Sequence, residues 1–73
     1  MLLGVGLSQF DGGLNAEHGR VIISNQNGIL FENGSYVNAN ALTLTIHQAT
    51  IDANNQLHLY DGNNNASITF EKL

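Results

Sequence analysis

Residues 24–40 read SNQNGILFENGSYVNAN, and this stretch decides the fold. Short apolar or β-prone segments at 21–23, 29–31 and 35–37 are separated only by Asn, Gly, Ser and Glu. None of these segments is long enough for a helix. Each is bounded by Asn or Gly, which tolerate the left-handed backbone conformation of sharp corners. We therefore expect short strands and a chain that changes direction about every seven or eight residues.

The second half of the chain has the same character. Apolar and polar residues alternate in 42–47, 57–60 and 67–70, as in strands that bury one face. Thr43, Thr45 and His47 are then expected to face outward. The expected inward residues are Leu42, Leu44, Ile46, Leu57, Leu59, Ile68 and Phe70.

Candidate strands begin near residues 21, 29, 36, 42, 49, 56 and 67. Three of the usual steps make about 20 or 21 residues, which is one coil of a three-sided parallel β-helix. The spacing therefore predicts an all-β fold, a parallel β-helix of about three coils, with Val21, Leu42 and residues near 63 stacked in register. Because hairpins turn at similar intervals, a small antiparallel β-sandwich is the alternative.

The length of 73 residues allows one domain, 1–73, of marginal stability as a lone monomer. Stacked short strands are expected over 21–73, and residues 1–20 are a candidate capping or leading segment. The chain has no Cys, so disulfides cannot supply the missing stability. Stacking on further structure of the same kind is the remaining source.

The formal net charge is −4, and Arg20 and Lys72 are the only basic residues apart from histidine. This excludes the basic surface of a nucleic-acid-binding protein. No apolar run approaches the roughly 18 residues of a membrane span, so no membrane insertion is expected. Residues 1–7 are apolar but lack the basic start of a signal peptide, which predicts either a cytoplasmic protein or a piece of a longer one.

No catalytic constellation is present, and we predict a protein that is not an enzyme. There is no Cys nucleophile and no G-x-S-x-G elbow. Residues 61–72 have the oxygen spacing of a calcium loop, but Ala66 replaces its glycine and Lys72 its closing Glu. His18, His47 and His58 are too scattered for a zinc site. No metal site and no cofactor are expected.

Tyr36, His58 and Tyr60 form a candidate ligand surface. Sugars favour aromatic platforms surrounded by amide groups, and Asn is abundant near all three residues. The alternative for the tyrosines is simple strand preference.

Residues 19–31 read GRVIISNQNGILF and resemble a motif of the filamentous-haemagglutinin type of two-partner secretion domain, G-x-V-x-x-x-N-P-N-G-I-x-F. The segment VNANAL at 37–42 is similar to the family's V-N-x-x-x-L, and SQFDGGL at 8–14 is similar to its S-Q-I/L-x-G-x-L. The likeness covers residues 8 to about 43. Gln26 stands where the family has Pro.

The resemblance implies a right-handed parallel β-helix in a secreted bacterial adhesin or haemagglutinin-like exoprotein that acts in outer-membrane export and surface attachment. It implies an outer-membrane β-barrel transporter as partner, and a secreted or cell-surface location as part of a longer precursor. The motif residues associated with secretion correspond to Asn25, Asn27, Gly28 and Ile29. A tight corner is the simpler role for the same residues.

Two other classes of protein fit the sequence. The first is a self-assembling structural protein, either an extracellular filament subunit or a β-helix of the phage tail-spike type located on a virion, because uncapped strand edges recruit further copies. The second is a small monomeric β-sandwich that binds a ligand such as a host glycan.

Overall fold

The computed structural model describes residues 2–3, 6–63 and 65–71, and within these ranges the chain is built from strands and turns without a helix. Accordingly, this described part contains no helix that could cross a membrane. The strands are β1 (Leu2–Leu3), β2 (Ser8–Phe10), β3 (Gly13–Ser24), β4 (Ile29–Phe31), β5 (Tyr36–Thr45), β6 (His47–Ile51), β7 (Leu57–Gly62) and β8 (Ile68–Phe70).

Six of these strands form two parallel sheets. One has the order β1-β3-β5 and the other has the order β2-β4-β8. Ser8 pairs with Ile29, and Val21 pairs with Leu42, in each case a residue 21 positions further along the chain. The predicted stacking of Val21 on Leu42 is confirmed, and the all-β prediction holds with it.

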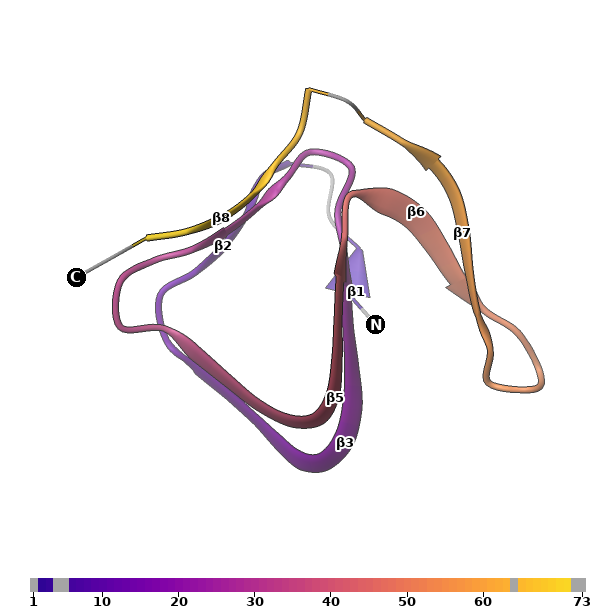
Figure 1. Cartoon of the computed structure of the whole chain (residues 1–73), viewed down its shortest axis with the longest axis horizontal. Coiled ribbons are helices and arrows are strands. Elements are labelled where there is room, and N and C mark those ends of the chain that lie inside the picture. The colour runs from indigo at the N-terminus through magenta and orange to yellow at the C-terminus, as the bar shows by residue number, and fades with distance from the viewer. Residues whose placement is uncertain (1, 4–5, 64, 72–73) are drawn as a thin grey trace.

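The two longest strands bend partway along their length. β3 and β5 run side by side in parallel, and their register shifts between Ala16 and Arg20. Figure 1 shows them following the same path around a corner, so that the chain outlines a triangle. The segments expected as separate strands near 36 and 42 are therefore one bent strand. Strand pairing also begins well before residue 21, because β1, β2 and the start of β3 already have partners.

The expectation for residues near 63 is wrong. β7 pairs antiparallel with β6 in a hairpin that projects from the side of the triangle (Figure 1), and it does not stack on Leu42. The turn at 52–55 explains this reversal, because the Asn55 amide donates to the Asp52 carbonyl and Asn55 adopts a positive φ of 62°. The chain then returns as β8, which pairs with β4, so Ile29 meets Ile68 after 39 positions.

The core lies inside the triangle and is small. Ile23, Ile29 and Phe31 are buried together. The partly buried residues packed against them are Phe10, Val21, Val37, Leu44 and Ile68. Ile22 is also buried, and strand alternation places it on the face of β3 opposite Ile23. β6 contacts β3 and lies outside the triangle in Figure 1.

The predicted inward pattern is only partly correct. Leu42, Leu59 and Phe70 are exposed, whereas Thr45 is buried. Leu42 and Phe70 lie on β5 and β8, the last strands of their sheets, and Leu59 lies on a hairpin of only two strands. Burial of Thr45 is compensated by hydrogen bonds, because its hydroxyl accepts from the His47 amide at 3.0 Å.

Three phenylalanines stack across the second sheet. The ring centroids of Phe10 and Phe31 are 5.0 Å apart, as are those of Phe31 and Phe70, with interplanar angles of 16° and 7°. We call these three residues the aromatic ladder. Each one occupies the third position of its strand, so the parallel register itself brings the rings together.

Replacement of Phe31 by Ala should remove the middle ring of the ladder and open a cavity. We expect a loss of about 3–5 kcal/mol in the free energy of unfolding, a large part of the roughly 4–11 kcal/mol available to 73 residues. Phe70→Ala is the control, with an expected loss of about 1 kcal/mol, because Phe70 has one ring neighbour and is 63% exposed. Urea unfolding of both variants measures the difference, and equal losses would contradict the proposed core.

Candidate functional site

The corner at residues 25–28 is held by the side chain of Asn25, which is 1% exposed. Its Nδ2 donates to the Gly6 carbonyl and to the Ser8 hydroxyl, the latter at 2.7 Å. Its Oδ1 accepts from the Asn27 amide at 2.8 Å. The Asn25 backbone amide donates to the Thr45 carbonyl at 3.0 Å. One residue thus links the preceding pass of the chain, its own corner and the following pass.

Gly28 completes the same corner. Its φ is +107°, a conformation that residues with a Cβ rarely adopt. A Cβ at this position would also lie 3.1 Å from the Ser67 carbonyl oxygen and 3.2 Å from Leu7 Cδ1. The next residue, Ile29, is completely buried in the core.

Of the four predicted secretion-motif residues, the structure therefore buries Asn25, Gly28 and Ile29 and leaves only Asn27 exposed. Burial of this kind serves the corner itself and leaves Asn27 as the one side chain a partner could reach. A role in secretion remains a prediction for all four residues.

Asn25→Ala should destabilise the protein far more than Asn27→Ala. Loss of the Asn25 amide leaves the Gly6 carbonyl and the Asn27 amide without their partners, which should lower the free energy of unfolding by about 2–3 kcal/mol. The exposed Asn27 should change it by less than about 0.5 kcal/mol. Urea unfolding of the two variants checks the difference, and a neutral Asn25→Ala would contradict the role of the corner.

Gln26 fastens the hairpin to this corner. Its Nε2 donates to the Asp61 carbonyl at 3.0 Å, and its Oε1 accepts from Gln48 Nε2 at 3.2 Å. Its backbone carbonyl accepts from Asn63 Nδ2 at 3.0 Å. A proline at this position, as in the motif that the sequence resembles, could make neither side-chain contact. The substitution therefore has a structural use that the sequence did not reveal.

His58 and Tyr60 lie on β7 of the hairpin, and both are exposed. His58 Nε2 lies 2.7 Å from Asp52 Oδ2. The other Asp52 oxygen accepts from the amides of Asn54 and Gln56 at 2.8 and 2.9 Å, which fixes the turn. These bonds, above all the one with His58, hold the pKa of the Asp52 carboxyl below its ordinary value of 3.8.

Acid should loosen the hairpin before the parallel sheets. Because the folded-state pKa of Asp52 lies below its unfolded value, its stabilising contribution is present above pH 3.8 and is lost as the pH falls through the folded-state pKa. Amide NMR signals of the turn, compared with those of β3 across this range, measure the effect. In the Asp52→Asn variant, the amide signals of the turn should not change with this titration. Turn signals that stay constant in the wild-type protein as the pH falls would contradict the stabilising role of the Asp52 carboxylate.

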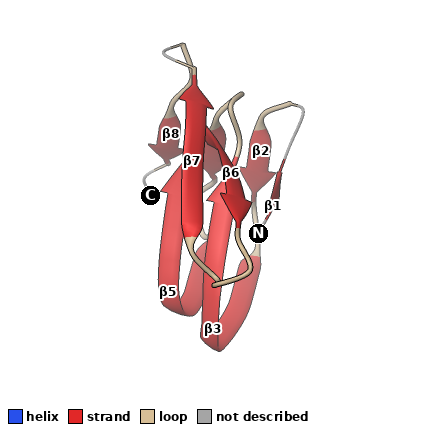
Figure 2. Cartoon of the chain, turned by 90° about the vertical axis from the view of Figure 1, so that its right-hand side faces the viewer, coloured by secondary structure: helices blue, strands red, loops and turns tan. Residues whose placement is uncertain are grey.

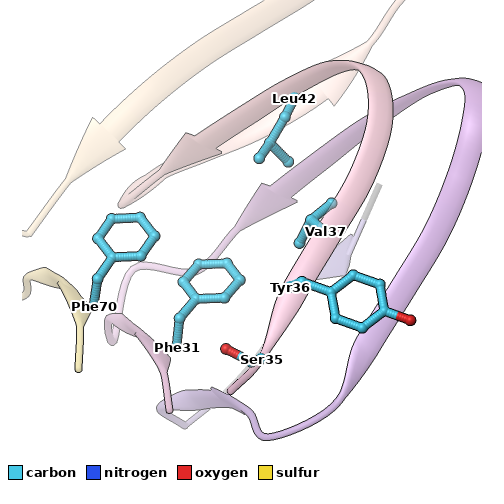
Figure 3. Close-up of a pocket in the computed structure, with 6 residues that line it drawn as sticks. All are labelled: Phe31, Ser35, Tyr36, Val37, Leu42 and Phe70. Atoms are coloured by element: carbon cyan, nitrogen blue, oxygen red, sulfur yellow. The ribbon is translucent and has the colours of Figure 1, made fainter. Parts of the chain in front are cut away.

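Tyr36 lies away from the hairpin residues, so the structure divides the predicted ligand surface. It begins β5 and lines a pocket of about 230 Å³ with Phe31, Val37, Leu42 and others. Figure 3 shows the rings of Phe31 and Phe70 side by side, with Leu42 across from them. The Tyr36 hydroxyl accepts from Asn15 Nδ2 at 3.3 Å. β8, which carries Phe70, and β7 lie on opposite sides of the molecule in Figure 1.

This pocket and the aromatic ladder were missed by the sequence analysis. The available signal was the recurrence of Phe at 10 and 31, one step of 21 residues apart. Phe70 breaks that spacing because the hairpin is inserted before β8.

The described residues offer no group of three or more His, Cys, Asp or Glu side chains that could hold a metal ion. In the calcium-like stretch, Asn63 Oδ1 accepts from the Asn65 amide within the turn, and its Nδ2 donates to the Gln26 carbonyl of the corner at 25–28, so both of its polar atoms already have partners.

Comparisons of the chain with models of protein families, with curated proteins and with solved structures find no match.

Proposed function

We propose that the chain is a stretch of right-handed parallel β-helix of about three coils, interrupted in its last coil by the β6–β7 hairpin. The common 21-residue step supports this reading, because it relates β1 to β3, β2 to β4 and the second half of β3 to β5. Equal steps on different sides of the triangle are what a coiled chain of constant circumference produces.

The proposed function is that of a non-enzymatic module in a secreted bacterial adhesin or haemagglutinin-like exoprotein, acting in outer-membrane export and surface attachment. The buried Asn25 corner is the observation that supports this function most directly. Residues 19–31, which resemble the secretion-domain motif, build this corner and the strands on either side of it. The partner is an outer-membrane β-barrel transporter. The location is secreted or at the cell surface, within a longer precursor.

Parallel strands with open edges suit such a role physically. In a longer protein, each later coil finds an edge already presenting unpaired N–H and C=O groups, so folding can proceed coil by coil outside the cell. Pairing of this kind helps draw the remaining chain outward. The exposed hairpin, with His58 and Tyr60, is the part of this module proposed to meet a host glycan.

The alternative function, a self-assembling extracellular filament subunit or tail-spike-type β-helix, is favoured by a different observation. Both sheets end in strands without an outer partner among the described residues: β1 and β2 at one end, β5 and β8 at the other.

An export assay tests the first proposal. The chain replaces the corresponding coils of a haemagglutinin-type exoprotein that carries its own signal peptide, and the secreted fraction is measured with and without its β-barrel transporter. We expect transporter-dependent secretion of the chimera. Asn27→Ala should reduce secretion severalfold without loss of folding, because Asn27 is the exposed residue of the motif.

Asn33→Ala is the matched control, since Asn33 is an exposed residue in the neighbouring Asn-Gly corner. It should leave secretion unchanged. Equal secretion of the Asn27 and Asn33 variants would show that the motif serves only as a corner. A chimera that folds but is never secreted would contradict the proposed export role.

A further inference from the structure

Within the part of the chain that the structure describes, the strands at both ends of the stack have no outer partner strand. We call the outer edge of β5 and β8 the C-terminal face, and the outer edge of β1 and β2 the N-terminal face. Figure 2 shows these pairs at opposite sides of the stack with the hairpin between them, so the hairpin covers neither face. The molecule measures 39 × 33 × 15 Å, and the stack is short compared with the width of its faces.

The C-terminal face is apolar and exposed. Tyr36, Leu42 and Phe70 are 55%, 44% and 63% exposed and lie around the same pocket (Figure 3). A monomer of 7.9 kDa is expected to expose about 4,400 Å² of surface, whereas this chain exposes 4993 Å². The uncovered ends and the projecting β6–β7 hairpin both contribute to this excess.

The backbone of β8 has its free groups on this face. The Glu71 amide donates to the Phe31 carbonyl, and the Ser67 carbonyl accepts from the Ile29 amide. The backbone N–H and C=O groups of residues 67 and 71 are therefore directed toward β4. Backbone groups alternate in direction along a strand. The N–H and C=O groups of Ile68 and Phe70 therefore point away from β4, toward the open edge.

The N-terminal face offers the complementary groups. The Ser8 amide donates to the Gly28 carbonyl, and the Phe10 carbonyl accepts from the Glu32 amide, so the backbone groups of Ser8 and Phe10 are directed toward β4. The backbone N–H and C=O of Gln9 are then directed outward, away from β4. Within the chain, parallel pairing sets Ser8 and Phe10 opposite Ile29 and Phe31. The same arrangement on β8 would place a second Ser8 and Phe10 opposite Ile68 and Phe70.

We propose that the C-terminal face of one copy binds the N-terminal face of a second copy, with β8 pairing in parallel with the second copy's β2. Phe10 of that copy then adds a fourth ring to the aromatic ladder at the 5.0 Å spacing already present twice. In the other sheet, Leu2 pairs with Ile23 and Ile23 with Leu44, so the second copy's β1 continues the series on β5. This inference rests on the β-helical stacking described under the proposed function.

Charge opposes this association. Each Phe of the ladder is followed by an acid, Asp11, Glu32 or Glu71, just after its strand ends. The Glu32 amide donates to the Phe10 carbonyl and the Glu71 amide to the Phe31 carbonyl, so the parallel register continues to these acids. A second copy would bring its Asp11 opposite Glu71, about 4.8 Å away along the stack. Like charges directly opposite one another destabilise strand pairing. Association should therefore strengthen with salt, which screens them, and with Glu71→Gln.

The test uses size-exclusion chromatography with light scattering over a range of concentrations, with circular dichroism on each fraction. The wild-type chain should elongate as concentration rises, and Glu71→Gln should do so at lower concentration. Two variants block one face each. Phe70→Asp removes the exposed ring of the C-terminal face, and Gln9→Pro removes an outward N–H from β2, where an edge strand tolerates proline.

Each blocked variant alone should remain a folded monomer, because every contact needs both faces. A mixture of the two should form a one-to-one heterodimer and nothing larger, since only one compatible pair of faces remains. Hydrogen exchange gives a readout without mutation: the amides of Gln9 and Phe70 should become protected as the wild-type concentration rises.

A folded, β-rich wild-type chain that stays monomeric up to its solubility limit would overturn the proposal and assign the C-terminal face to another occupant, such as a following segment of a longer chain. So would a mixture of the two blocked variants that shows no heterodimer while both are folded. Neither result bears on export, which the chimera assay measures separately.

Discussion

A fully hydrogen-bonded side chain in a tight corner sets the geometry of the whole molecule. Asn25 is buried, and a buried amide is tolerated only when its donors and acceptor have partners. Those partners lie on the preceding pass of the chain, within the corner and, through the backbone, on the following pass. The corner therefore helps to set the direction of the chain and the 21-residue step, which relates β1 to β3, β2 to β4 and the second half of β3 to β5.

The step also determines how stability is distributed. In parallel register, equivalent positions lie above one another, so three phenylalanines become a ladder and Ile23 lies beside Leu44. Among the residues whose side chains the structure describes, five apolar ones are buried, because a stack this short has few inner positions and two wide ends. The middle pass is stabilised from both sides, and the outer passes from one side only.

Both functional proposals arise from this same property. A stack of similar passes has no natural end, and its last strands carry unpaired backbone groups beside exposed apolar side chains. Such an edge can accept later coils of a longer exported protein or the opposite face of another copy. The side hairpin is a separate feature, tied to the corner through Gln26 and presenting His58 and Tyr60 to solvent.

The sequence by itself determined the strand class, the corners and the step between Val21 and Leu42, because Asn-Gly turns and short β-prone segments are local signals. It also singled out Asn25, Gly28 and Ile29 as motif residues. In the structure all three are buried in or beside the corner and are not exposed to a partner. Only the tertiary structure decided that residues 47–62 form an antiparallel hairpin, that Phe70 joins the ladder and that Tyr36 lies apart from Tyr60. These outcomes depend on which strand edge the chain meets after each turn. Contacts between segments distant in sequence decide which edge a strand joins. The apolar/polar alternation of a segment does not reveal its partner, because the same alternation suits pairing with any of the available strands.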